Sequence, residues 1–376
     1  MASIKLKGDT SGEVTISAPA VAGTTTLELP ATSSTLATQN ALGVRNLIIN
    51  GDMRIAQRGT SATVSGTTFV YRTVDRVLFR ANGVGAFTES QDTDVPSGQG
   101  FSKSVKYLCT TSASPSTSGW LQFNYRMEGQ NLQHLNYGTS EAKKLTASFW
   151  VKSNKTGTYI TRLFSYDTTR SIQKAITINS ADTWEKKIIT FDGDTVSSLD
   201  NDNNFSLSFD MWLSAGTDYQ SGTLATTWSS YSNPNTAVGQ VNLADAVNNY
   251  INITGLQLEV GDTATPFEHR PYDMELQRCM RYYEKNILQI IGGRATSTTN
   301  IQWISAKWTV EKRANPTIVF YGNSTANSVR SSGGATVTLN SPSIGSQTKG
   351  TDYVNVSSGL TSGEFYQAGY TADSEL

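Results

Sequence analysis

Apolar and polar side chains alternate strictly through Leu145-Thr146-Ala147-Ser148-Phe149-Trp150-Val151-Lys152, and again through Phe205-Ser206-Leu207-Ser208-Phe209-Asp210-Met211-Trp212-Leu213. Successive side chains of a β-strand point to opposite faces of a sheet. Each stretch therefore predicts a strand with one face in a shared core. Trp150 and Trp212 break the pattern, because each indole falls on the polar side of its strand.

Further strands are predicted on both sides of these two stretches. They are expected at residues 13–17, 25–29, 76–80, 105–110, 120–127, 159–166, 184–191 and 250–260. In the last of these, the apolar parity changes across Thr254-Gly255, which predicts a β-bulge at Gly255. Many short strands without helical patterns between them are typical of an antiparallel β-sandwich or jelly roll.

The pattern changes after Pro271. Between Met274 and Lys285 the apolar residues recur at helical spacing, and Asp273 is placed to cap a helix. Strand patterns then return, at residues 301–304, 307–310, 317–321 and 335–339. We therefore expect an all-β chain with four parts: an N-terminal attachment segment at 1–45, a jelly-roll β-sandwich at 46–272, a connecting helix at 273–289 and a smaller β domain at 290–376. Residues 1–45 hold too few large apolar residues for a core of their own.

Composition excludes several classes of function. The 376 residues carry a net charge of −1 and only 16% charged residues, and no basic run could follow a phosphate backbone, so we expect no nucleic-acid partner. No stretch resembles a signal peptide or a membrane span, so synthesis in the cytoplasm without membrane insertion is expected. Cys109 and Cys279 have no second ligand nearby for zinc. With only His134 and His269 as histidines, an enzyme is not expected.

Two sets of acidic residues are candidates for metal binding or glycan hydrolysis. Asp200-Asn201-Asp202-Asn203-Asn204 begins like a calcium loop, but Phe205 and Met211 stand where an EF-hand needs glycine and glutamate. We interpret it as a polar loop. Glycan hydrolysis needs two neighbouring carboxylates, and nothing brings together Glu128, Asp210 and Glu259, which lie on or beside different strands.

The two ends of the predicted sandwich resemble a known family. The segment NLIINGDMRIAQRG at 46–59 resembles the opening of a domain common in bacteriophage tail fibres and related virion proteins. Its partner motifs are ITGLQLEVG at 253–261, ATPFEHRPY at 264–272 and CMRYY at 279–283, and residues 148–153 with 157–159 resemble the central strands of the family. Residues 13–38 are similar to N-terminal repeats of fibres from phages of marine cyanobacteria. The resemblance covers roughly residues 10 to 290.

This resemblance implies a carbohydrate-binding-module-like jelly roll on a homotrimeric tail fibre. The chain would be a structural protein of the virion tail that attaches to a host-surface glycan or protein, with residues 1–45 joined to other tail or baseplate proteins. Two alternatives stay open: a capsid-bound head fibre or decoration protein, and a surface-polysaccharide depolymerase. No cofactor and no catalytic residue is implied, although the resemblance leaves a structural calcium ion open.

Five aromatic residues are the predicted glycan ligands. Trp150 and Trp212 are expected to face outward among polar neighbours, where a flat indole can stack on a sugar ring. Tyr219, Trp228 and Tyr231 lie in an irregular Ser/Thr/Gly-rich stretch and form a mobile aromatic loop or a lid in this interpretation. The alternative is that a neighbouring subunit covers the outward indoles in an oligomer.

Overall fold

The computed structural model describes residues 3–7, 11–17, 45–340, 342–356 and 359–376, which divide into two compact units, 1–43 and 44–376. The prediction of an all-β chain is confirmed, with one α-helix among the described residues. In the first unit, β1 (Ser3–Lys7) pairs with β2 (Glu13–Ser17) as an antiparallel hairpin, so the strand predicted at 13–17 is present. The strand predicted at 25–29 lies outside the described residues.

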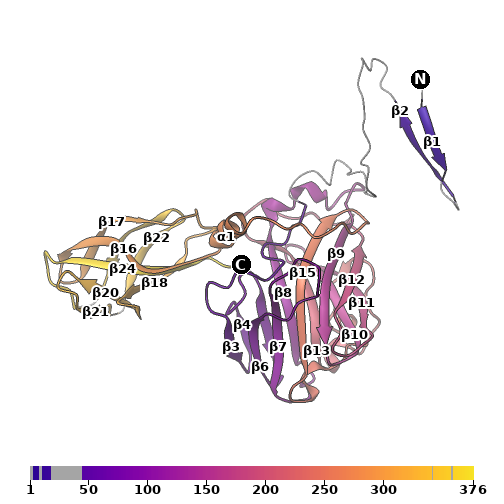
Figure 1. Ribbon diagram of the computed structural model, residues 1–376, viewed down its shortest axis with the longest axis horizontal. Helices are drawn as coiled ribbons and strands as arrows, with labels where there is room; N and C mark the ends of the chain where they lie inside the picture. Colours follow the sequence, from indigo (N-terminus) through magenta and orange to yellow (C-terminus); the bar gives the residue numbers. More distant parts are fainter. Residues whose placement is uncertain (1–2, 8–10, 18–44, 341, 357–358) are drawn as a thin grey trace. The chain divides into compact units, whose positions relative to one another are not determined.

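A sandwich of two antiparallel sheets follows (Figure 1). The seven-stranded sheet has the order β14 (Ser229–Ser230), β11 (Arg170–Ile178), β10 (Gly157–Ser165), β13 (Phe205–Ala215), β8 (Trp120–Glu128), β5 (Leu78–Asn82) and β4 (Thr68–Val70). The six-stranded sheet has the order β12 (Glu185–Phe191), β9 (Leu145–Ser153), β15 (Tyr250–Val260), β7 (Ser104–Thr111), β6 (Ala86–Asp92) and β3 (Ser61–Val64).

The core lies between these sheets and contains the predicted apolar faces. Every apolar member of the Leu145–Val151 alternation is buried in it, as are Leu207, Phe209, Met211 and Leu213. Phe205 is not, so the inward direction predicted for it is wrong. The register of β13 shifts between Phe205 and Leu207, and this irregularity turns the Phe205 ring out of the core.

Residues 46–51 close the sandwich against β15. Leu47 N donates to Leu258 O (2.9 Å) and Leu256 N donates to Gly51 O (2.9 Å), while Met53 N donates to Asn50 O (3.0 Å) across a turn. The predicted bulge is confirmed, because the register of β15 against β9 shifts between Thr254 and Gln257. Gly255 adopts φ +63° there, in the left-handed region that favours glycine.

The Glu268-His269-Arg270 segment fixes this closure to the helix. Arg270 is buried and donates to Asn46 O (2.5 Å) and Ile48 O (3.2 Å), and it pairs with Glu275 (3.2 Å). Glu268 accepts the backbone N–H groups of Arg45 and Asn46 (2.9 and 2.8 Å). Arg270 is buried, Glu268 is half-buried and His269 is exposed, and the hydrogen bonds of this segment fix the start of the sandwich to the helix.

Helix α1 (Tyr272–Met280) is shorter than predicted. Pro271 stands at its N-terminal cap and Asp273 makes no cap hydrogen bond, so that prediction is wrong. Residues from Tyr283 onward, expected to be helical up to 289, instead form β16, because their backbone pairs with a strand near the end of the chain. No helix in the described part of the chain is long and apolar enough to cross a membrane.

The remaining described strands form one sheet with its own core, which includes Trp303, Phe320, Tyr366 and Tyr370. The strands are β16 (Tyr283–Ser297), β17 (Asn300–Lys307), β18 (Thr317–Gly322), β19 (Thr325–Ala326), β20 (Ser328–Ser331), β21 (Thr336–Thr338), β22 (Ser343–Gln347), β23 (Gly350–Asn355) and β24 (Phe365–Asp373). The strand predicted at 307–310 is wrong, since β17 ends at Lys307.

Residues 373–376 return to the sandwich beside the point where the chain left it. Tyr283 at the start of β16 pairs with Asp373 at the end of β24. The Asp373 side chain also forms an ion pair with Arg58 (3.0 Å), and Glu375 forms a buried ion pair with Arg76. The Arg76 guanidinium lies 3.5 Å from the centroid of the Tyr282 ring. Charged hydrogen bonds and cation–π contacts thus join the C-terminal sheet to the sandwich.

Candidate functional site

The outer face of the seven-stranded sheet carries arginines and aromatic rings. Strand register sets Arg80 opposite Gln122 and Gln122 opposite Trp212 on this face. Two residues earlier along β13, Asp210 lies opposite Asn124 of β8 on one side and Arg162 of β10 on the other. Directly paired residues of antiparallel strands share a face, so all of these side chains point away from the main core.

A buried ion pair forms the floor of this face. Arg162 donates through Nε to Asp210 Oδ2 (2.7 Å), and Asn124 donates to the other carboxylate oxygen. The Arg162 guanidinium also lies 5.0 Å from the ring centroid of Phe164 and 5.6 Å from that of Tyr231. Removal of either partner would leave the other charge buried and unpaired, which would destabilise this part of the sheet.

Trp212 lies on this face but is covered. Its outward direction is confirmed, since it belongs to a small cluster outside the main core. Its expected exposure is wrong, because only 1% of the residue is accessible. The ring of Tyr219 lies 5.1 Å from the indole, and Ala237 of the same connecting segment completes the cover. The lid over Trp212 is thus a segment of the same chain.

The structure does not bring the five predicted ligands together. Trp212, Tyr219 and Tyr231 share the outer face of the seven-stranded sheet. Trp150 lies half-buried on the outer face of the other sheet, opposite Lys186 of β12. Trp228 packs at the border of the main core, where its Nε1 donates to Asp192 O (2.6 Å). Trp150 and Trp228 therefore do not contribute to a site with the other three.

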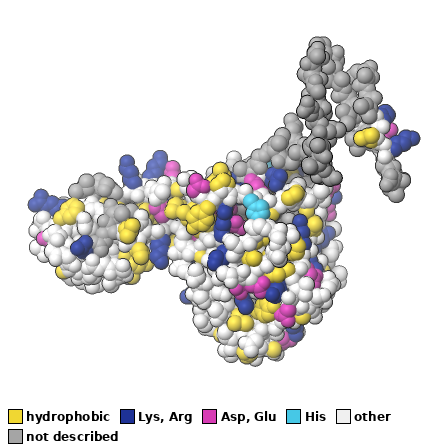
Figure 2. All heavy atoms as spheres, viewed as in Figure 1, with side chains coloured by type: hydrophobic (Ala, Val, Ile, Leu, Met, Phe, Trp, Pro, Cys, Tyr) yellow, Lys and Arg dark blue, Asp and Glu magenta, His cyan; other side chains and the backbone are white. Residues whose placement is uncertain are grey.

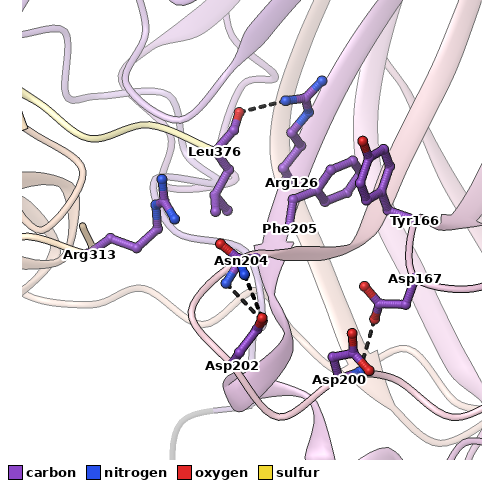
Figure 3. A pocket seen from close by; sticks show the side chains of 9 residues that line it. All are labelled: Arg126, Tyr166, Asp167, Asp200, Asp202, Asn204, Phe205, Arg313 and Leu376. Atoms are coloured by element: carbon purple, nitrogen blue, oxygen red, sulfur yellow. Dashed lines mark hydrogen bonds between the residues drawn. The ribbon is translucent and has the colours of Figure 1, made fainter. Parts of the chain in front are cut away.

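A hollow of about 560 Å³ opens at one end of the same outer face (Figure 3). Its lining residues are Arg126, Tyr166, Asp167, Asp200, Asp202, Asn204, Phe205, Arg313 and Leu376. Tyr166 is 62% exposed, and its ring stacks on Phe205 at 5.0 Å and 28°. The Arg126 guanidinium lies 4.7 Å from the Phe205 centroid, so Phe205 supports one exposed ring and one cation.

Three carboxylates border the hollow without a cationic partner. Among the described residues, no lysine or arginine lies within ion-pair distance of Asp167, Asp200 or Asp202. Asp200 N donates to Asp167 Oδ2 (2.9 Å) and Asn204 N donates to Asp202 Oδ1 (2.9 Å), which orders the two loops. Arg313, on the other side of the hollow in Figure 3, is held by backbone oxygens of Asn203 and Ser374. The carboxylates keep free lone pairs for hydroxyl donors.

These acidic residues do not form a metal cluster: no group of three or more His, Cys, Asp or Glu in the described ranges is arranged to hold a metal ion. The carboxylates weighed for hydrolysis are each bound elsewhere. Glu128 receives two hydrogen bonds from Arg281 (2.9 and 2.8 Å), and Glu259 receives two from Thr265, one from its backbone N–H (2.9 Å) and one from its hydroxyl (2.7 Å). Burial is the largest influence and opposes the ionisation of Glu128, but the hydrogen bonds from Arg281, Tyr282 and Gln130 and the Arg281 charge together outweigh it and lower the Glu128 pKa.

Comparisons with known proteins give structural neighbours only. No family model matches the sequence, and no curated protein matches it either. Among solved structures, the chain is similar to the enzymatically active domain of tailspike protein 4 of bacteriophage CBA120 (10% identity, TM-score 0.31). That likeness covers 57% of this chain and 21% of the tailspike chain, so the chain matches about a fifth of its length.

Carbohydrate-binding modules are also among these neighbours. One is TmCBM61 in complex with β-1,4-galactotriose (9% identity, TM-score 0.29, covering 58% of this chain and 99% of that one). Another is the family 11 module from Clostridium thermocellum in complex with a mixed-linked tetrasaccharide (13% identity, TM-score 0.23, covering 58% and 95%). Identities and TM-scores this low do not assign a function.

Sequence reasoning missed the residues that line the hollow. Tyr166 was placed only as the end of a predicted strand, and Asp200 and Asp202 only as a failed calcium loop. An available signal was the pair Tyr166-Asp167, where an aromatic ring and a carboxylate leave the sheet together after Ser165, the last residue of β10. Arg126 gave no signal, because its role depends on β13 and on residues near the end of the chain.

Proposed function

We propose that the chain is a glycan-binding virion protein whose sandwich contacts sugar through the hollow at Tyr166. The observation that carries the proposal is an exposed tyrosine ring, stacked on Phe205, beside carboxylates that have no cationic partner in the described part of the chain. A flat ring packs on the apolar face of a pyranose, and free carboxylates accept hydrogen bonds from sugar hydroxyls. The combination selects a polar ligand that also has a flat apolar face.

We propose that the sandwich binds sugar without cleaving it. The carboxylates of Glu128, Asp210 and Glu259 are engaged in hydrogen bonds to neighbouring residues, which leaves none of the three poised as an acid or nucleophile. Incubation of the purified protein with host envelope polysaccharide would release no reducing ends. Steady release would instead favour the depolymerase.

The sequence resemblance supports a place for the chain in a tail fibre. In that proposal the protein is a homotrimer, joined to other virion proteins through residues 1–45, and it mediates attachment to the host surface. Imaging of particles that carry a labelled copy is expected to show the label at the tail, whereas label over the head would favour a head fibre or decoration protein. Light scattering is expected to give three copies, and a stable monomer at micromolar concentration would contradict the trimer.

The glycan site is tested by substitution of its exposed ring. Tyr166→Ala removes the stacking surface, and we expect affinity for the best ligand on an oligosaccharide array to fall about tenfold, which is roughly 1.4 kcal/mol. Tyr166→Phe keeps the ring and is expected to stay within about threefold of the wild type. Isothermal titration calorimetry measures both.

A matched control lies in the C-terminal sheet. Tyr353 is 39% exposed, so Tyr353→Ala also removes an exposed tyrosine but not one in the hollow. It is expected to leave the affinity unchanged. Equal affinities for wild type and Tyr166→Ala, with both proteins folded, would remove the hollow from the binding site.

A further inference from the structure

Arg80 occupies a second position on the outer face of the seven-stranded sheet, at the edge formed by β4, β5 and β8. Its guanidinium lies 5.0 Å from the ring centroid of Phe69 and 5.0 Å from that of Trp120. Nη1 donates to Gln122 Oε1 (3.1 Å), which fixes the plane of the group. Contacts with two rings and one amide hold this guanidinium in a defined orientation.

This arginine has no carboxylate partner among the described residues. Asp210 is the acidic residue whose charge raises the Arg80 pKa most, but its carboxylate is already bound to Arg162 and Asn124. Burial lowers the Arg80 pKa to about 10, and repulsion from Arg162 and Arg126 adds to the effect. Arg80 therefore lies near a buried carboxylate that is already paired, while two further arginines repel it.

The excess positive charge is local. On the side of the molecule that Figure 2 shows, charged side chains form small separate groups of either sign. Net charge is −1 over the chain, so no general field attracts polyanions. Arg80 Nε is buried, so an anion would reach this guanidinium through its Nη groups, whose one acceptor among the described residues is Gln122 Oε1.

The surroundings of Arg80 are suited to a sugar. Phe69 is 50% exposed and its ring meets Trp120 edge-on at 5.3 Å, so an apolar surface lies beside the cation. Asn82, directly opposite Trp120 in the register, donates to Ser118 O (3.1 Å) and accepts from Thr67 (2.8 Å) at the exposed edge. Hydroxyl and amide groups thus border the aromatic pair.

We propose that Arg80, between Phe69 and Trp120, binds the anionic group of an acidic glycan, a carboxylate or a sulfate carried on a sugar ring. The proposal rests on the proposed function, because it names the class of glycan that the same outer face selects. A planar guanidinium binds carboxylate and sulfate through paired hydrogen bonds, which an ammonium group cannot reproduce. The hollow at Tyr166 supplies stacking and hydroxyl contacts, whereas Arg80 supplies the preference for negative charge.

The test compares acidic with neutral polysaccharides on the full chain. Immobilised polygalacturonate and dextran sulfate are presented beside carboxyl-reduced polygalacturonate and plain dextran, and binding is followed by biolayer interferometry. Wild-type protein is expected to bind at least one acidic polymer with about tenfold higher affinity than its neutral counterpart. The polygalacturonate pair tests recognition of a carboxylate, and the dextran pair tests recognition of a sulfate. The preference is expected to decrease as salt rises.

R80Q is the decisive variant. We expect it to lose the preference for acid and to bind the neutral polymers as the wild type does. R80K keeps the charge without the planar group and is expected to lie between them; it replaces R80Q if R80Q melts well below the wild type. K186Q removes a cation from the outer face of the other sheet and is expected to behave like the wild type.

The outcomes separate the two proposals. The role of Arg80 would be overturned, with the glycan site left standing, if the wild type bound neutral and acidic polymers equally well. The same would follow if R80Q and R80K kept the preference for acidic polymers. No binding to any of the four polymers, together with an inert Tyr166→Ala, would overturn both the role of Arg80 and the glycan site.

Discussion

Glu89 is a carboxyl group inside the sandwich. It lies on β6 opposite Tyr107 of β7 and is fully buried, and neither of its carboxyl oxygens has a hydrogen-bond partner among the described residues. Burial raises its pKa to about 8, which the nearby Thr73 hydroxyl and the more distant Arg72 and Arg58 offset only in part. The side chain is therefore protonated at neutral pH in the folded protein.

The raised pKa of Glu89 makes the stability of the sandwich depend on pH. Because the unfolded side chain ionises near its ordinary value of 4.5, the folded state binds the extra proton between that value and about 8, and stability falls as pH rises through this window. In urea unfolding, the free energy of unfolding of the wild type is expected to fall by roughly 3–5 kcal/mol between about pH 5 and pH 9, relative to that of Glu89→Gln. Parallel pH profiles for the two proteins would show that Glu89 ionises without penalty.

Single residues also show where sequence reasoning stops. Alternation was enough to predict the direction of Trp212, because the side-chain period of a strand is a local property. Its burial was not predictable, since Tyr219 and Ala237 cover it from a loop with no periodic pattern. Tyr166 was overlooked for another reason: its partner Phe205 leaves the core only through an irregular register.

At the scale of elements, the closure of the sandwich depends on the absence of a side chain at Gly51. A Cβ at this position would lie 2.1 Å from Leu256 O, which is backbone of the neighbouring strand β15. Gly51→Ala is expected to push residues 46–51 away from β15 and to lower the free energy of unfolding by about 2–3 kcal/mol. Chemical denaturation measures the change.

Gly333→Ala is the matched control, because the nearest atom to its added Cβ is Ser331 Oγ at 3.9 Å. This variant is expected to change stability by less than about 0.5 kcal/mol. If Gly51→Ala proves equally neutral, the packing of residue 51 against β15 is looser than described.

The elements that could be predicted are those with a local pattern. Parity predicted the bulge at Gly255 and most strands of the sandwich, but it missed β3, β4, β6, β11 and β14. The end of α1 could not be predicted either, because Leu276, Cys279, Met280 and Tyr283 keep helical spacing past the point where the helix stops. Pairing with β24, some ninety residues away, competes with the helix there. A pattern within a short window carries no information on that partner.

At the scale of the whole molecule, residues 44–376 form one compact unit with their own cores. A chain without residues 1–43 retains the Arg45 hydrogen bonds to Glu268 and Pro266, so we expect its melting temperature to stay within about 2 °C of the full chain. Glycan affinity is also expected to persist, while incorporation into particles is lost. Normal occupancy of the truncated protein on virions would place the attachment role in another part of the chain.

The pairing of Tyr283 with Asp373 has a consequence for how such a protein can change. Directly opposed residues of an antiparallel pair lie about 5 Å apart, so everything between these two positions leaves and re-enters at one small opening. The C-terminal sheet is in this sense a cassette: another β domain whose ends lie equally close can be exchanged at the same junction with both connections unchanged in length. Arg58 and Arg76 form their ion pairs with Asp373 and Glu375, which lie outside the exchanged segment. The same ion pairs would therefore anchor any domain inserted at this junction.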